Sequence, residues 1–175
     1  QEKYSVTENW NLSCIVVLPC YQKQGFGRFL IDFSYLLTRR EKKVGTPEQP
    51  FSNLGRVTYA AYWKSALLEY LRNVFKVENR EQFSLYDIAV DTGISLNDAV
   101  KVLEALGMLV KDKDSDCIEL LYNEELIEAH WKKAQANKER IWIDESVLKW
   151  EPAKHAPLED GIVGSPSREV SPALS

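Results

Sequence analysis

The sequence contains few of the residues that build metal and disulfide sites. Among its 175 residues there are two histidines and three cysteines, Cys14, Cys20 and Cys117. An odd number of cysteines without regular spacing does not form a disulfide framework. Neither histidine lies near a Cys-x-x-Cys pair that would make a zinc site. We therefore expect a reducing compartment and no metal ligand in this stretch of sequence.

Long apolar runs and an excess of basic residues are also missing. No stretch approaches the roughly 20 apolar residues that cross a bilayer, and no signal-peptide pattern opens the chain. The sequence has 22 Lys and Arg against 26 Asp and Glu, a net charge of −4. That balance argues against a dominant nucleic-acid surface. We expect no membrane partner and no specific DNA binding.

The first half of the chain alternates between extended and helical patterns. The apolar run at residues 12–18, which Pro19 ends, predicts a buried strand. Apolar residues at helical spacing predict one helix from Phe26 onward and another around residues 59–70. Prolines and glycines between these helices predict a loop.

The second half has a different pattern. Ser84 and Ser95 are predicted N-caps of two short helices, the second of which Gly107 ends. A charged turn follows, with a strand at residues 117–121 and a further helix at residues 123–135. Helix, turn, helix and hairpin are typical of a winged helix. Prolines and Ser-Pro pairs predict disorder beyond residue 151.

Two glycines stand between the first predicted strand and its helix, in Gln22-Lys23-Gln24-Gly25-Phe26-Gly27-Arg28. A helix N-terminus exposes unpaired N–H groups and the positive end of its dipole, and glycines allow a ligand to approach that backbone. Lys23 and Arg28 would add charge-assisted bonds. The pattern indicates a cradle for a phosphate-bearing ligand. On local grounds alone, a tight strand-to-helix turn explains it equally well.

This segment resembles the Q/R-x-x-G-x-G/A acetyl-coenzyme A loop of the GNAT-like acetyltransferases. A longer stretch, from Asn11 through GRFLIDFSYLL and YWKS to Trp150, is similar to the catalytic core of the MYST histone acetyltransferases, in particular the MOZ/MORF branch. The resemblance implies an α/β (α+β) fold. It places a GNAT-like acetyl-CoA-binding core at residues 1–80, a helix-turn-helix or winged-helix-like segment at residues 81–151 and a disordered tail at residues 152–175. It also implies that the family's zinc finger, and with it the zinc, precedes residue 1.

Acetylating a lysine requires a base, because the free amine has a pKa of about 10.4. Glu48, in Thr46-Pro47-Glu48-Gln49-Pro50, matches the family's general base, and the flanking prolines limit the conformations of its loop. Cys14 matches the family's strand cysteine. It would either accept the acetyl group as a nucleophile or shape the pocket while the amine attacks the thioester directly. We favour direct attack.

Acetyl-CoA is the co-substrate that the resemblance implies. The strand residues would offer main-chain groups to the pantetheine arm, the glycine loop would bind the pyrophosphate, and Ser52 matches a serine near the sulfur. The expected coenzyme-binding residues are Ser13, Cys14, Ile15, Val16, Val17, Gln22, Lys23, Gln24, Gly25, Phe26, Gly27, Arg28 and Ser52.

The implied function is acetyl transfer to histone-tail lysines in the nucleus, within a multiprotein complex that acts on nucleosomes. The sequence departs from the family's pattern at Asn53, Ala61 and Asn137. The departures at Asn53 and Asn137 leave a second hypothesis open, a catalytically inactive scaffold of a chromatin complex. Turnover of acetyl-CoA distinguishes the two.

Overall fold

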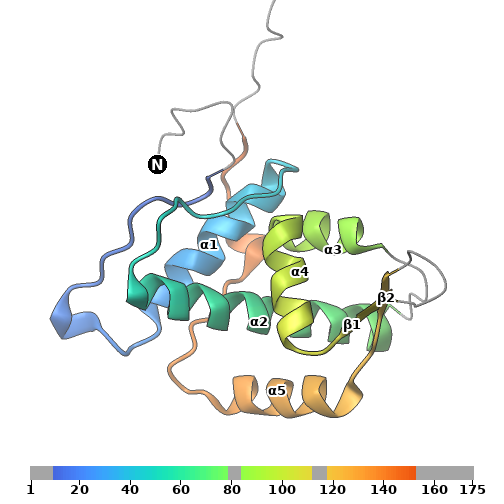
Figure 1. The fold of residues 1–175 in the computed structure, drawn as a ribbon. Coiled ribbons are helices and arrows are strands. Elements are labelled where there is room, and N and C mark those ends of the chain that lie inside the picture. The colour runs from blue at the N-terminus through green and yellow to red at the C-terminus, as the bar shows by residue number, and fades with distance from the viewer. Residues whose placement is uncertain (1–9, 79–83, 112–117, 153–175) are drawn as a thin grey trace, which may run out of the picture.

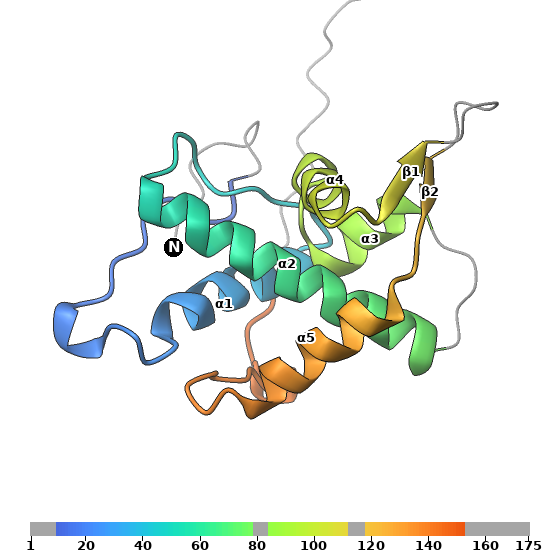
Figure 2. The ribbon, with the colours of Figure 1, turned by 60° about the horizontal axis from the view of Figure 1, so that its bottom comes forward.

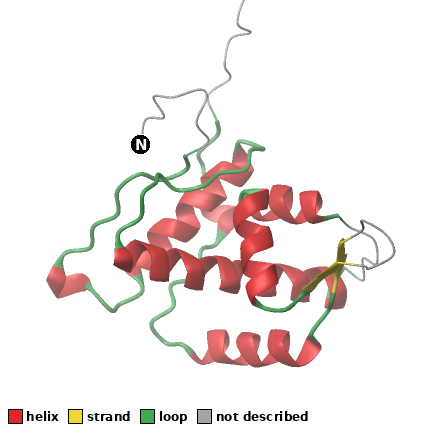
Figure 3. Cartoon of the chain, in the orientation of Figure 1, coloured by secondary structure: helices red, strands yellow, loops and turns green. Residues whose placement is uncertain are grey.

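The structure is a computed structural model that describes residues 10–78, 84–111 and 118–152. Helices dominate it, and the strands form one small sheet (Figures 1 and 3). In chain order, the elements are η1 (Pro19–Tyr21), α1 (Phe26–Arg40), α2 (Asn53–Lys76), α3 (Leu85–Thr92), α4 (Leu96–Ala105), β1 (Leu109–Lys111), β2 (Ile118–Leu120), α5 (Glu124–Ala136) and η2 (Glu145–Val147).

Helix α2 is the centre of the fold. It packs against α1, α3, α4 and α5, and Figure 2 shows it running through the middle of the molecule with α5 alongside. Its side chains Leu67, Leu68, Leu71 and Val74 have no solvent exposure. Burying each such side chain contributes about 1.5–3 kcal/mol, so the helix is held by apolar contacts on several sides.

Aromatic residues join α1 to α2. The rings of Tyr35 and Tyr62 stack with centroids 5.2 Å apart. Trp63 Nε1 donates to the Tyr35 hydroxyl at 2.7 Å, and burial raises the pKa of that hydroxyl far above its ordinary value. The buried polar atoms of Tyr35 and Trp63 form a hydrogen bond with each other, and this bond favours one orientation of α1 on α2.

The predicted helices of the second half are confirmed. Ser84 and Asp87 form a capping box at α3, Ser95 caps α4, and Asn123 caps α5. Strands β1 and β2 pair antiparallel, with Leu109 opposite Leu120. The end of the predicted 117–121 strand at Cys117 and the turn before it lie outside the described residues.

The predicted buried strand at residues 12–18 is wrong. This segment is extended, but it belongs to no sheet among the described residues. Val16 is 80% exposed and Leu18 is 61% exposed. An apolar run becomes a buried strand only where neighbouring strands pair with it. The loop at residues 46–48 pairs with the start of this segment, through Asn11 N to Thr46 O and Glu48 N to Leu12 O, both 3.0 Å.

The observed fold is therefore a mixed one, mostly helical with a two-stranded sheet. A single cluster of buried side chains extends from Ile31 on α1 to Ile127 on α5. The predicted boundary at residues 80–81 and the tail from residue 153 lie outside the described residues, so this division of the chain stays a prediction. No helix in the described part combines the length and apolar character that a membrane span needs.

Candidate functional site

A pocket of about 470 Å³ opens beside residues 12–18, here called the extended segment, the first turn of α1 and the loop that leads into α2. Apolar walls from Ile31, Phe51 and Tyr59 close one part of it. The structure brings together here many of the residues that the sequence singled out, namely Ser13, Ile15, Val17, Gln22, Lys23, Gly27, Glu48 and Ser52.

The extended segment contributes alternate residues to this pocket. Successive side chains of an extended chain point in opposite directions, so Ser13, Ile15 and Val17 line the pocket. Cys14 and Val16 are exposed and do not line it. The structure therefore places the Cys14 side chain outside this pocket, and both the role of Cys14 and a main-chain role for this segment stay predictions.

Glu48 is held at the pocket by the extended segment. Its carboxylate accepts a hydrogen bond from the hydroxyl of Ser13, and its N–H donates to the carbonyl of Leu12 at 3.0 Å. The preceding Pro47 is buried and lines the same pocket. A carboxylate fixed in this way can accept a proton from a group that enters the pocket.

The two glycines of the loop have different structural roles. Gly25 is the N-cap of α1 with φ of 83°, and a Cβ atom there would lie 2.1 Å from the carbonyl oxygen of Glu139. Gly27 lines the pocket, and its nearest neighbour for a Cβ atom would be Val17 Cγ2 at 4.0 Å. Gly25 thus permits close packing of the chain, whereas Gly27 leaves room at the pocket.

The other polar residues of the loop bind backbone nearby. Gln22 Nε2 donates to the Val17 carbonyl, and Gln24 Nε2 donates to the Cys20 carbonyl, both at 3.0 Å. Gln24, Gly25 and Phe26 do not line the pocket. These contacts fix the conformation of the turn between the extended segment and α1.

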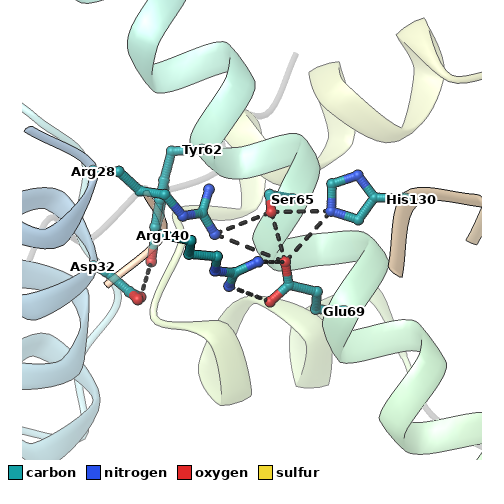
Figure 4. Close-up of polar contacts among 7 residues, drawn as sticks. All are labelled: Arg28, Asp32, Tyr62, Ser65, Glu69, His130 and Arg140. Carbon is teal, nitrogen blue, oxygen red and sulfur yellow. Dashed lines mark hydrogen bonds and ion pairs between the residues drawn. The ribbon is translucent and has the colours of Figure 1, made fainter. Parts of the chain in front are cut away.

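Arg28 does not lie where the sequence predicted. It does not line the 470 Å³ pocket but points from α1 into a polar cluster with Ser65, Glu69 and Arg140 (Figure 4). There its Nη2 lies 3.0 Å from Ser65 Oγ and 3.7 Å from Glu69 Oε1, and its guanidinium stands over the Tyr62 ring. Burial, followed by the nearby charge of Arg140, lowers the pKa of Arg28. In this arrangement Arg28 orients α1 rather than facing an anion.

Glu69 is the centre of that cluster. Its two carboxylate oxygens accept from Arg140 at 2.6 and 2.7 Å, and Ser65 donates to it at 2.6 Å. His130 Nε2 lies 3.0 Å from Ser65 Oγ and 3.4 Å from Glu69 Oε1. Burial alone would raise the pKa of Glu69, but its hydrogen bonds with His130, Arg140 and Ser65 lower it to about 2.

The sequence interpretation missed this cluster. The only available signal was local, because Ser65 and Glu69 are four residues apart and therefore share a face of α2. Arg140 lies more than 70 residues further along the chain, and no pattern links it to that face.

A second pocket, of about 740 Å³, lies between α2 and α5. Its basic lining comes from Arg28, Lys64, His130, Lys133 and Arg140. Ala61 and Asn137 also line it, and these are two positions at which the sequence departs from the pattern it resembles. Within the described residues, no group of three or more His, Cys, Asp or Glu could hold a metal ion.

Comparison with known proteins places these features in a family. The chain is 44% identical over 145 residues to the histone acetyltransferase KAT6A of Homo sapiens, covering 83% of the chain and 7% of that protein. Histone acetyltransferase KAT6B of Homo sapiens is 41% identical over the same shares. The histone acetyltransferase Tip60 homolog of Caenorhabditis elegans is 35% identical over 89% of the chain and 33% of its own length.

The chain therefore spans about 7% of the length of the KAT6A and KAT6B proteins that it matches. The family match covers residues 1–148 and includes both halves of the fold. The chain belongs to the MOZ/SAS family.

Proposed function

We propose that this chain is the coenzyme-binding and catalytic part of a nuclear histone acetyltransferase. The substrates are acetyl-CoA and the ε-amine of a histone-tail lysine, presented by nucleosomes to a multiprotein complex. The observation that supports the proposal is the pocket in which Glu48 and Ser13 meet the glycine loop at Gly27. The names of the relatives, which are histone acetyltransferases, support the same reaction.

Glu48 is the general base of the proposed reaction. It accepts a proton from the lysine ammonium, and the neutral amine then attacks the carbonyl carbon of the thioester. A new C–N bond forms and the C–S bond breaks. The nitrogen then loses its second proton to become the amide, and the departing thiolate of the coenzyme takes up that proton. Ser13, which donates to the Glu48 carboxylate, holds that carboxylate toward the pocket.

Ser52 is placed to assist the leaving thiolate. Its Oγ accepts from the N–H of Gly55 at 3.0 Å and so caps α2. A hydroxyl that accepts one hydrogen bond still has its own proton to donate. Because Ser52 lines the pocket, its hydroxyl can donate a hydrogen bond to a sulfur bound there.

The coenzyme is bound along the pocket by the extended segment and the glycine loop. The main chain at residues 13–17 bonds the amides of the pantetheine arm, and the N–H groups at the start of α1 receive the pyrophosphate. Lys23 lines the pocket and supplies positive charge. Arg28, which is engaged with Ser65 and Glu69, supports the loop from below.

We favour direct attack over a covalent acetyl-cysteine. Cys14 is exposed and does not line the pocket with Glu48. A nucleophile must lie within reach of both its base and the thioester carbon. Direct attack needs only the incoming amine, the thioester and Glu48.

The finer features of the fold belong to the same proposal. The extended segment, α1 and α2 correspond to a GNAT-like acetyl-CoA-binding core, and α3, α4 and the β1–β2 hairpin to a winged-helix-like segment. Zinc would be bound by family residues that are not part of this sequence. The winged-helix-like segment is proposed to support the core rather than bind DNA.

An inactive scaffold is the second candidate function. Ala61 and Asn137 line the basic pocket between α2 and α5 in place of a serine and a lysine that bind coenzyme in some family members. Their loss weakens one end of the coenzyme site. The scaffold hypothesis predicts partner binding without turnover.

The test compares the full-length protein with its Glu48→Gln variant, using labelled acetyl-CoA and nucleosomes. We expect acetyl transfer to fall by at least about 100-fold while coenzyme binding is retained. Glu124→Gln, on the exposed face of α5, is the control for the same chemical change. A wild-type protein that binds acetyl-CoA but acetylates no histone would favour the scaffold.

A further inference from the structure

The loop that carries Glu48 pairs with two segments that are far from it in sequence. On one side, Thr46 O accepts from Asn11 N, and Glu48 N donates to Leu12 O, both at 3.0 Å. On the other side, Gly45 N donates to Gly93 O at 2.8 Å, and Ser95 N donates to Gly45 O at 3.0 Å. The loop is thus held between the extended segment and the turn that joins α3 to α4.

One side-chain contact completes this arrangement. Thr46 Oγ1 donates to Asp98 Oδ2 at 2.8 Å. Asp98 lies in the first turn of α4, is only 7% exposed, and also accepts from Ser95 Oγ at 2.6 Å. A buried carboxylate that accepts two hydroxyl donors has a fixed orientation. Thr46, two residues before Glu48, is therefore held by both its carbonyl and its side chain.

We infer that Asp98 and Thr46 are positioning residues for the base Glu48, and that the helix-turn-helix at α3–α4 serves catalysis as the support of this loop. The inference rests on the function proposed above. Thr46 and Asp98 do not line the pocket, so they act only through the loop. A misplacement of about 1 Å in a reacting group can cost about 100-fold in rate. The loss of one hydrogen bond that anchors the loop should therefore produce a measurable fall in kcat.

The test uses three threonine variants of the full-length protein. Thr46→Val removes the hydroxyl and keeps the side-chain shape, whereas Thr46→Ser retains the hydroxyl. Thr38→Val is the matched control, because Thr38 is 1% exposed and its hydroxyl donates to the Ser34 carbonyl of its own helix, at 3.0 Å. All three are compared with wild type for kcat, KM for acetyl-CoA, thermal stability and hydrogen exchange at the Glu48 amide.

We expect Thr46→Val to lower kcat by at least about tenfold, with KM for acetyl-CoA within about twofold of wild type and faster exchange at Glu48. Thr46→Ser should restore kcat. Thr38→Val should not reproduce this pattern: it should reduce stability without a selective loss of kcat or a change at the Glu48 amide.

Two results would overturn the inference. One is a Thr46→Val protein with the kcat and Glu48 exchange of wild type. The other is an equal loss of kcat in Thr46→Val and Thr38→Val, which would reflect stability alone. Failure of the proposed function gives a different result, because a wild-type protein without acetyl transfer would refute both proposals. An active wild type together with a Thr46→Val variant of unchanged kcat would refute only the positioning role of Thr46 and Asp98.

Discussion

Arg140 donates to both carboxylate oxygens of Glu69, at 2.6 and 2.7 Å. This bidentate pair joins the segment after α5 to the middle of α2. Arg28 reaches the same carboxylate from the first turn of α1, at 3.7 Å, as Figure 4 shows. Three parts of the chain therefore share one partly buried negative charge.

This cluster predicts a specific dependence of stability on pH. Burial alone would raise the pKa of Glu69, but its hydrogen bonds lower it from 4.5 to about 2 in the folded state. Because the folded pKa is depressed, the carboxylate stabilises the fold above about pH 5, and this contribution is lost as pH falls toward 2. The expected loss is on the order of 3 kcal/mol in the free energy of unfolding.

Glu69→Gln should remove that dependence between about pH 5 and pH 2. It should also destabilise the protein by about 3 kcal/mol at pH 7, because Arg28 and Arg140 lose their buried partner. Denaturant unfolding at several pH values measures both effects. Glu124→Gln is the control, since the Glu124 side chain is 65% exposed, and an identical pH profile for Glu69→Gln and wild type would contradict the assignment.

Gly25→Ala should be one of the most destabilising single changes in the loop. The alanine would have to adopt φ of 83°, and its Cβ would meet the Glu139 carbonyl oxygen at 2.1 Å. We expect a loss of at least about 3 kcal/mol in the free energy of unfolding. Gly107→Ala isolates the backbone cost, because φ there is 66° and a Cβ meets nothing within 4 Å, so about 1–2 kcal/mol should be lost. Equal losses would show that the contact with Glu139 is unimportant.

Gly27→Ala should separate binding from stability. Gly27 lies within α1 with ordinary helical backbone, so alanine should leave stability unchanged or raise it by up to about 1 kcal/mol. The added methyl group projects beside Val17 at the pocket. Acetyl-CoA binding, measured by calorimetry, should weaken by at least about tenfold. Unchanged affinity would place the coenzyme elsewhere.

Cys14→Ala should keep most of the acetyl transfer. The side chain is exposed and lies outside the pocket, so its loss removes no contact with Glu48. We expect kcat within about threefold of wild type, since direct attack does not pass through the thiol. Trapping of an acetylated Cys14 that forms and decays at the rate of turnover would instead establish the covalent route.

Much of the helical fold could be predicted from the sequence, because its signals are local. Ser84 and Ser95 cap the helices that they were predicted to cap, and a cap depends only on the next three residues. The glycine loop was also found locally, from a short motif, whereas Glu48 was identified only through the resemblance to the MYST family. The structure then brought them to one pocket.

The features that could not be predicted depend on partners distant in the chain. Residues 12–18 have the composition of a buried strand, but burial depends on which strands lie beside them. Arg28 is a plausible phosphate ligand by sequence, and only the buried carboxylate of Glu69, 41 positions away, directs it elsewhere. Long-range pairing of this kind leaves no periodic signal in the sequence.

The pairing of Gly45 and Thr46 with residues on either side has a consequence for the order of folding. These contacts join residues 11–12, 45–48 and 93–98, so closing them requires long loops that form only at an entropic cost. The loop that carries Glu48 should therefore become ordered late, after α3 and α4 have packed on α2. A polypeptide cut near residue 80 would retain Glu48 and the glycine loop, yet it would lack the surface on which that loop takes its final conformation.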